Sequence, residues 1–161
     1  MIAPAGVTVS IYDGLGSLPH FNPDLDREGH TPPESVLSLR NQVGEADALI
    51  ISTPEYAHGV PGSLKNALDW LVSSLEFPGV AVGVINPSLE SFHANASLME
   101  ILKTMSARLP AEANVRIPIR NRNTDPAAIA ADPALSDALR SVIAALVAAG
   151  PRESRGAFYN P

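Results

Sequence analysis

Short apolar runs along the chain predict the strands of a sheet. Residues 7–12 (VTVSIY) alternate β-branched and polar side chains, a pattern that favours a strand. Residues 48–53 (ALIIST) and 80–85 (VAVGVI) are almost wholly apolar, as is typical of strands that a parallel sheet buries on both faces. A further strand is predicted at residues 115–119.

Between these runs, apolar residues recur at helical spacing. Residues 34–45 show this spacing, and Glu34 suits the first turn of a surface helix. Residues 63–71 predict a helix that packs one face on the sheet, and residues 98–105 predict another amphipathic helix. Because strands and helices alternate, we expect an α/β domain with a mostly parallel sheet.

The C-terminal part of the chain carries clear helix boundaries. Residues 134–149 form an alanine-rich stretch that Asp132 and Pro133 begin and Gly150 ends, which predicts a capped helix. The tail, residues 151–161, is predicted to be disordered. Residues 1–150 are therefore expected to form a single domain.

The order of these elements also predicts where a ligand binds. Open α/β folds place ligands at the carboxyl ends of their parallel strands, so we expect the site just after Thr53, Asn86 and Tyr12. The loop at residues 14–33 is longer than structureless loops usually are in compact domains. We therefore expect this loop to be functional, mobile or both.

Composition limits the chemistry that the chain can perform. With 161 residues it is long enough for one domain with a substantial core. It has no cysteine, which excludes disulfides, thiolate metal sites, iron–sulfur clusters and thiol nucleophiles. Any redox chemistry would therefore need a cofactor.

Charge and hydropathy limit the partners. The 17 acidic and 11 basic residues give a net charge of -6 without a basic cluster, which argues against a nucleic-acid partner. The apolar runs are far shorter than the roughly 20 residues of a membrane helix, and no secretory signal is evident. We therefore expect a cytoplasmic protein without a membrane partner.

One acidic cluster raises the question of a metal site. Its spacing matches neither an EF-hand nor a zinc site, so we expect a solvated, mobile loop and no metal. Its members are Asp24, Asp26, Glu28 and His30.

The strongest functional signal follows the strand predicted at residues 48–53. Residues 54–62 (PEYAHGVPG) contain two prolines and two glycines within nine positions. Such a loop is stiff, and its backbone can come close to a flat ligand. It leads into a helix N-terminus, which favours anions or electron-rich carbonyl groups. This arrangement is typical of a loop that holds a cofactor.

Residues 54–70 (PEYAHGVPGSLKNALDW) resemble the motif PEYN-x-x-x-PG-x-LKNA-x-DW of the NADPH-dependent FMN reductase family, which includes chromate, quinone and azo-dye reductases. Residues 18–26 (LPHFNPDLD) are similar to the family's LP-x-(Y/F)-N-x-D-(L/I) stretch. The resemblance covers residues 6–150. It implies a flavodoxin-like fold, a three-layer sandwich around a mostly parallel sheet.

The resemblance also implies a function. NADPH or NADH would deliver a hydride to bound FMN, which would pass electrons to a small acceptor such as a quinone, an azo compound, a metal oxyanion or free flavin. Backbone amides would face the flavin ring, so no catalytic side chain is required. Family members are dimers, which implies a homodimer or a dimer of dimers. The residues expected to hold the cofactor are Thr53, Pro54, Glu55, Tyr56, Ala57, His58 and Gly59.

Three departures from the family pattern affect these expectations. Ala57 stands where the family has Asn, which removes one side-chain hydrogen bond. Residues 86–93 (NPSLESFH) stand where the family often has a glycine-rich stretch beneath the ring. The family's opening strand and its GS-x-R-x-x-S-x-N loop, which cradles the FMN phosphate, are absent.

The missing opening segment has two explanations. Either the sequence begins at an internal Met of a longer gene, or the short chain binds flavin weakly or not at all. The absent strand would lie between residues 7–12 and 48–53.

Several residues have a structural interpretation beside the functional one. Glu55 is a site residue, a solvent-facing residue or an interface salt-bridge partner. Tyr56 stacks on the ring edge or plugs the loop against the sheet. His58 is a proton donor or an exposed, passive residue. Trp70 is expected in the core or a dimer interface rather than at the flavin.

Two other functions stay open. The chain could be a flavin-free family member that acts as a dimerising or regulatory module. A hydrolase is the third hypothesis, but no G-x-S-x-G elbow surrounds Ser88, Ser91 and His93.

Overall fold

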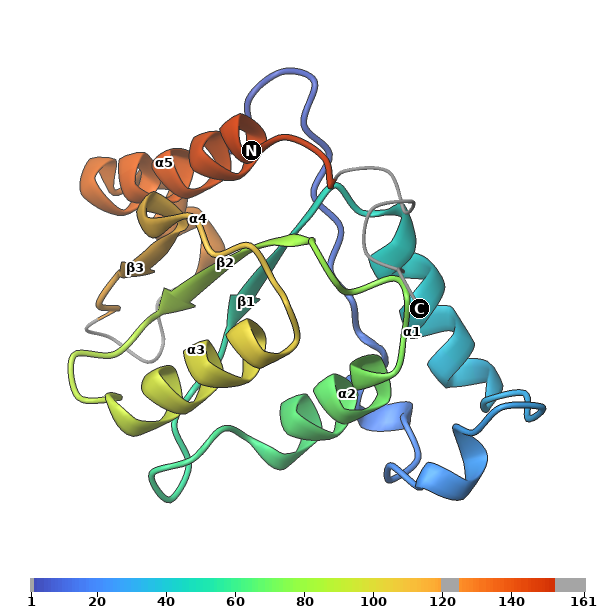
Figure 1. Ribbon diagram of the computed structural model, residues 1–161. Coiled ribbons are helices and arrows are strands. Elements are labelled where there is room, and N and C mark those ends of the chain that lie inside the picture. Colours follow the sequence, from blue (N-terminus) through green and yellow to red (C-terminus); the bar gives the residue numbers. More distant parts are fainter. Residues whose placement is uncertain (1, 120–124, 153–161) are drawn as a thin grey trace.

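A computed structural model describes residues 2–119 and 125–152 and shows a parallel sheet with helices on both faces (Figure 1). In the described part of the chain the sheet has the order β1-β2-β3. Its strands are β1 (Ala48–Ser52), β2 (Ala81–Asn86) and β3 (Asn114–Arg116). The register pairs Ala48 with Ala81 and Asn86 with Arg116. The predicted α/β class is confirmed.

The helices form the two outer layers of the sandwich. They are α1 (Glu34–Glu45), α2 (Gly62–Val72), α3 (His93–Thr104), α4 (Pro126–Ala131) and α5 (Pro133–Ala149), with 3₁₀ turns at Gly14–Ser17, Pro23–Leu25 and Ala111–Ala113. Side chains alternate across the fully buried strand β2. Val82 and Val84 pack with α1, α2 and α3, whereas Ala81 and Ile85 pack with α5. The sheet is therefore covered on both faces, as the three-layer prediction requires.

The prediction of a strand at residues 7–12 is wrong. The segment is irregular, and no strand of the described chain lies in register with it. Val9 is 57% exposed and Ile11 is 89% exposed. β-branched alternation favours an extended backbone, but an extended segment becomes a strand only when a neighbour pairs with it.

Strands β1 and β3 differ from their predicted burial and extent. In the described chain β1 forms the edge of the sheet, and Ile50 is 42% exposed, so burial on both faces is not achieved there. Strand β3 ends at Arg116, although the amides of Ile117 and Ile119 still donate to the carbonyls of Asn86 and Pro87. Pro118 lies between them and has no amide hydrogen to continue the ladder.

The long loop at residues 14–33 is held against α1 and α2. The Trp70 indole donates to the Pro19 carbonyl at 2.8 Å, and Asn66 bonds the backbone of Pro19 and Phe21. Trp70 is fully buried, so it belongs to the core. The two segments that carry the family resemblance therefore fold against each other.

The predicted solvation of the acidic cluster is wrong for Asp26. Its side chain is 5% exposed and lies 2.7 Å from the Arg40 guanidinium. Asp24, by contrast, is 78% exposed. Arg40 on α1 and Ser73 after α2 reach Asp26 across the fold, a contact that local spacing could not show.

The capping prediction for α5 is confirmed. The Asp132 side chain accepts a hydrogen bond from the Leu135 amide, and Gly150 ends the helix with a φ of 68°.

The predicted disordered tail falls on residues 151–161, of which 153–161 lie outside the described ranges. Arg152 is described and donates to the carbonyls of Gly44 and Glu76. Over residues 2–119 and 125–152, no helix is both long and apolar enough to cross a membrane.

Candidate functional site

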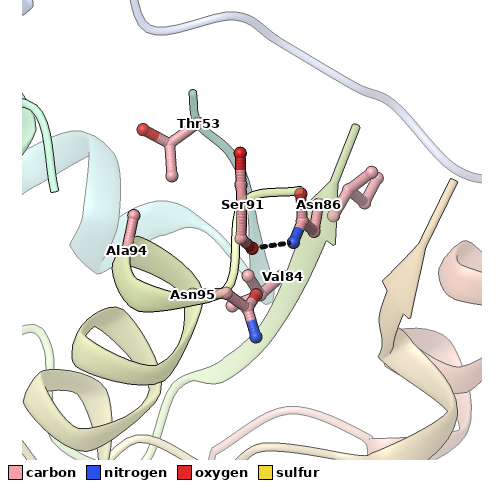
Figure 2. A pocket seen from close by; sticks show the side chains of 7 residues that line it. Thr53, Val84, Asn86, Ser91, Ala94 and Asn95 are labelled. Carbon is pink, nitrogen blue, oxygen red and sulfur yellow. Dashed lines mark hydrogen bonds between the residues drawn. The ribbon is translucent and has the colours of Figure 1, made fainter. Parts of the chain in front are cut away.

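The predicted cofactor loop lies at the carboxyl edge of the sheet, directly after β1. Beside it, a small cleft opens between the ends of β1 and β2 and the start of α3 (Figure 2). The cleft is lined by Thr53, Val84, Ile85, Asn86, Ser91, Ala94 and Asn95. The structure thus brings Thr53 and Asn86 together at one edge, whereas Tyr12 packs with the core and is not among the lining residues.

The loop turns back on itself at residues 56–59. The amides of Tyr56 and Gly59 each donate to the other residue's carbonyl, at 3.1 and 2.9 Å. Between them, Ala57 has a φ of 48° and His58 a φ of 60°. A two-residue hairpin turn with both central residues at positive φ is type I′, which favours Asn and Gly. Ala57 and His58 therefore hold a strained backbone at the predicted site.

Because Ala tolerates positive φ less well than Asn, the turn is less stable with Ala57 than with the Asn that the family has at this position. We predict that Ala57→Asn raises the free energy of unfolding by about 0.5–1 kcal/mol, because Asn tolerates the left-handed region better than Ala. Ala57→Val should lower it by a similar amount, since a β-branched residue fits that region worst. Urea denaturation of both variants measures the effect. Shifts of the same sign in both variants would contradict a strained turn.

The loop leaves backbone donors unused. Within residues 2–119 and 125–152, the amides of Glu55, Ala57 and His58 donate to no protein acceptor. Three such amides on a stiff turn can bind the carbonyl oxygens and ring nitrogens of a flat heterocycle. The described residues include no counterpart of the family's phosphate-binding loop.

Glu55 points inward, unlike its neighbours in the loop. Its carboxylate accepts a hydrogen bond from the Ala94 amide at 2.8 Å and lies 3.2 Å from Nδ1 of His58. The bond from the Ala94 amide, together with His58, lowers the pKa of Glu55 although desolvation opposes the shift. Glu55 is thus not the solvent-facing residue considered above, because its side chain is 10% exposed.

Two other loop residues are exposed. Tyr56 is 67% exposed, so it does not plug the loop against the sheet. The His58 side chain is 77% exposed, and its ring lies edge-on to that of His93 with 4.4 Å between the centroids. Both side chains are accessible to a bound ligand.

Asn86 shapes the loop after β2, a role that the sequence did not reveal. Its side-chain amide donates to the Ser91 carbonyl at 2.6 Å (Figure 2). Its Oδ1 accepts from the Ser88 amide at 3.0 Å. A buried Asn at the end of a buried strand, followed by Pro-Ser, is the available sequence signal. This loop stands where the family's glycine-rich stretch was expected.

Over the described ranges, no group of three or more metal-binding side chains is present.

The open parallel sheet, covered by helices on both faces and followed at its carboxyl edge by the loop of residues 54–62, is that of a flavodoxin-like α/β protein. The chain belongs to the NADPH-dependent FMN reductase family, whose model matches residues 1–120. The resemblance noted from the motifs is therefore confirmed.

Individual relatives agree with this assignment. A quinone reductase of Escherichia coli (strain K12) is 41% identical over 70 residues, which cover 44% of this chain and 37% of the relative. An NADH:(hydroxy)cinnamate reductase subunit of Vibrio ruber is 39% identical over 111 residues, covering 65% and 53%. The chain therefore spans about a third to a half of the length of these two relatives.

A solved structure gives the same picture. The flavoenzyme NAD(P)H:(acceptor) oxidoreductase FerB from Paracoccus denitrificans superposes with a TM-score of 0.63 and 27% identity, over 84% of this chain and 79% of FerB. The flavodoxin-like fold is thus confirmed.

Proposed function

We propose that this chain binds the ring of FMN at the turn of residues 56–59 and acts in an FMN-dependent NAD(P)H oxidoreductase. The observation that carries the proposal is the set of unused amides on that turn and on Glu55 just before it, beside the cleft at the carboxyl edge of the sheet. Family membership and relatives named quinone reductase support it.

Each part of the loop has a role in this proposal. FMN, when bound, supplies hydride acceptance from NAD(P)H and electron transfer onward. The amides of Glu55, Ala57 and His58 bind the polar edge of the ring and stabilise negative charge there. The exposed Tyr56 ring flanks the cofactor, and Thr53 and Gly59 complete the loop. No side chain of this chain is assigned as a catalytic acid or base.

The finer features of the proposal follow the family. The electron donor is NADPH or NADH, and the electron acceptor is a quinone-type molecule. Azo compounds, metal oxyanions and free flavin are further classes of small acceptor.

We propose a homodimer or a dimer of dimers in the cytoplasm. Exposed apolar side chains at Val72 and Leu75, 64% and 76% exposed, offer a surface for self-association. Light scattering of the purified chain measures its oligomeric state.

The experiment that tests the proposal is a titration of the purified chain with FMN. Quenching of flavin fluorescence and NADPH oxidation that depends on added FMN and a quinone would support it. Colourless protein that stays inactive at saturating FMN would overturn it. That result would favour the alternative of a flavin-free dimerising or regulatory module.

Gly59 provides a local prediction for ring binding. A Cβ built on Gly59 meets only the Tyr56 carbonyl oxygen, at 3.6 Å, so the fold itself does not require glycine there. Gly59→Val should therefore leave thermal stability unchanged while weakening FMN binding about tenfold, because the added side chain blocks close approach of the ring. Gly16→Val is the control, since a Cβ on Gly16 meets nothing within 4 Å. Equal FMN affinity in both variants would contradict the ring position.

A further inference from the structure

The helix that borders the cleft has no cap of its own. The N-cap position of α3 is Phe92, whose side chain makes no capping hydrogen bond. The first amides of any helix lack partners within the helix. In α3 one of these donors, the Ala94 amide, is satisfied by Glu55, which lies 39 positions earlier in the chain. Glu55 of the cofactor loop therefore caps the N-terminus of α3.

A second contact links the same two elements. The other oxygen of Glu55 lies 3.2 Å from Nδ1 of His58, a central residue of the strained turn. The His58 ring in turn packs edge-on against His93 at the start of α3. Glu55 is thus bonded to the helix on one side and to the turn on the other.

From this geometry we infer that Glu55 is a positioning residue: it fixes the turn of residues 56–59 on the N-terminus of α3 and thereby sets the orientation of the cofactor loop. The inference rests on the proposed function for its consequence on FMN. Both oxygens of Glu55 are occupied by Ala94 and His58, so its side chain acts through the turn rather than by contact with the ring. The turn needs such a tether, because two non-glycine residues at positive φ do not hold that conformation unaided.

The test compares Glu55→Ala and Glu55→Gln with Glu90→Gln, an exposed carboxylate in the neighbouring loop. Amide hydrogen exchange is followed at Ala94 and at Gly59, whose amide closes the turn, with Val84 in β2 as the internal reference. Glu55→Ala should lower protection about tenfold at both Ala94 and Gly59. Glu55→Gln keeps an acceptor for the Ala94 amide and should restore part of the protection. Glu90→Gln should change neither.

The same variants are then titrated with FMN. Glu55→Ala should weaken FMN binding about tenfold and Glu55→Gln by less, in the order of their protection at Gly59. Loss of protection at Ala94 alone, with Gly59 exchange and FMN affinity unchanged, would reduce Glu55 to a helix cap and overturn the inference. Absence of FMN binding in the wild-type chain would overturn the proposed function and the flavin consequence, while exchange at Gly59 still decides the tether.

Discussion

Trp70→Ala should lower the free energy of unfolding by about 4–6 kcal/mol. Trp70 is among the largest fully buried side chains, and removal of a buried Trp side chain costs about 3–5 kcal/mol. Its ring also packs edge-on against Phe21, with 5.0 Å between the centroids. The indole donates to the Pro19 carbonyl at 2.8 Å, and loss of that bond costs about 0.5–1.5 kcal/mol more, because the Asn66 side chain still donates to the same carbonyl. Urea denaturation at 25 °C measures the change.

Two further variants separate the contributions of Trp70. Trp70→Phe retains most of the buried area but removes the indole donor, so it should cost about 0.5–1.5 kcal/mol, because Asn66 still donates to the Pro19 carbonyl. Ser63→Ala changes an exposed side chain on the same helix that makes no capping bond, and should cost less than about 0.5 kcal/mol. A Trp70→Phe cost near zero would show that the loop at residues 14–33 is not anchored through the indole donor.

The elements that the sequence predicted well are those whose patterns are local. Strand β2 is a continuous apolar run with a helix on each side, and the helices show apolar residues at helical spacing within a single segment. The failures depend on partners elsewhere. Residues 7–12 have a strand-like pattern without a neighbouring strand to pair with, and Ile50 lies on an edge whose position no local pattern reveals.

The same distinction applies to the site. The loop at residues 53–59 could be found from its Pro and Gly content and its place after a buried strand. Its geometry could not, because Ala57 and His58 are not residues that signal positive φ. The bond from Ala94 to Glu55 joins residues 39 positions apart, so only the folded sheet brings them together.

Arg40→Ala should lower the free energy of unfolding by about 3–5 kcal/mol, because it leaves a buried carboxylate without its partner. The side chains of Arg40 and Asp26 are 13% and 5% exposed, with 2.7 Å between their charged groups. The same guanidinium donates to the Trp70 carbonyl near the end of α2 at 2.7 Å and to Ser73 Oγ at 3.1 Å. The substitution therefore removes an ion pair and a helix C-terminal contact together.

The exposed pair Arg140–Asp137, with 2.9 Å between its charged groups and side chains 55% and 74% exposed, is the matched control. Arg140→Ala should cost less than about 0.5 kcal/mol, because an exposed pair at this spacing contributes little. Pairing Arg40→Met with Asp26→Leu should recover the part of the loss that arises from the unpaired charge, but not the contact with the Trp70 carbonyl. Urea denaturation at low and high salt distinguishes the two sites, because salt screens the exposed pair far more strongly than the buried one. Equal costs for Arg40→Ala and Arg140→Ala would show that the Asp26 carboxylate is solvated after all, and that the loop at residues 14–33 is held by Trp70 and Asn66 alone.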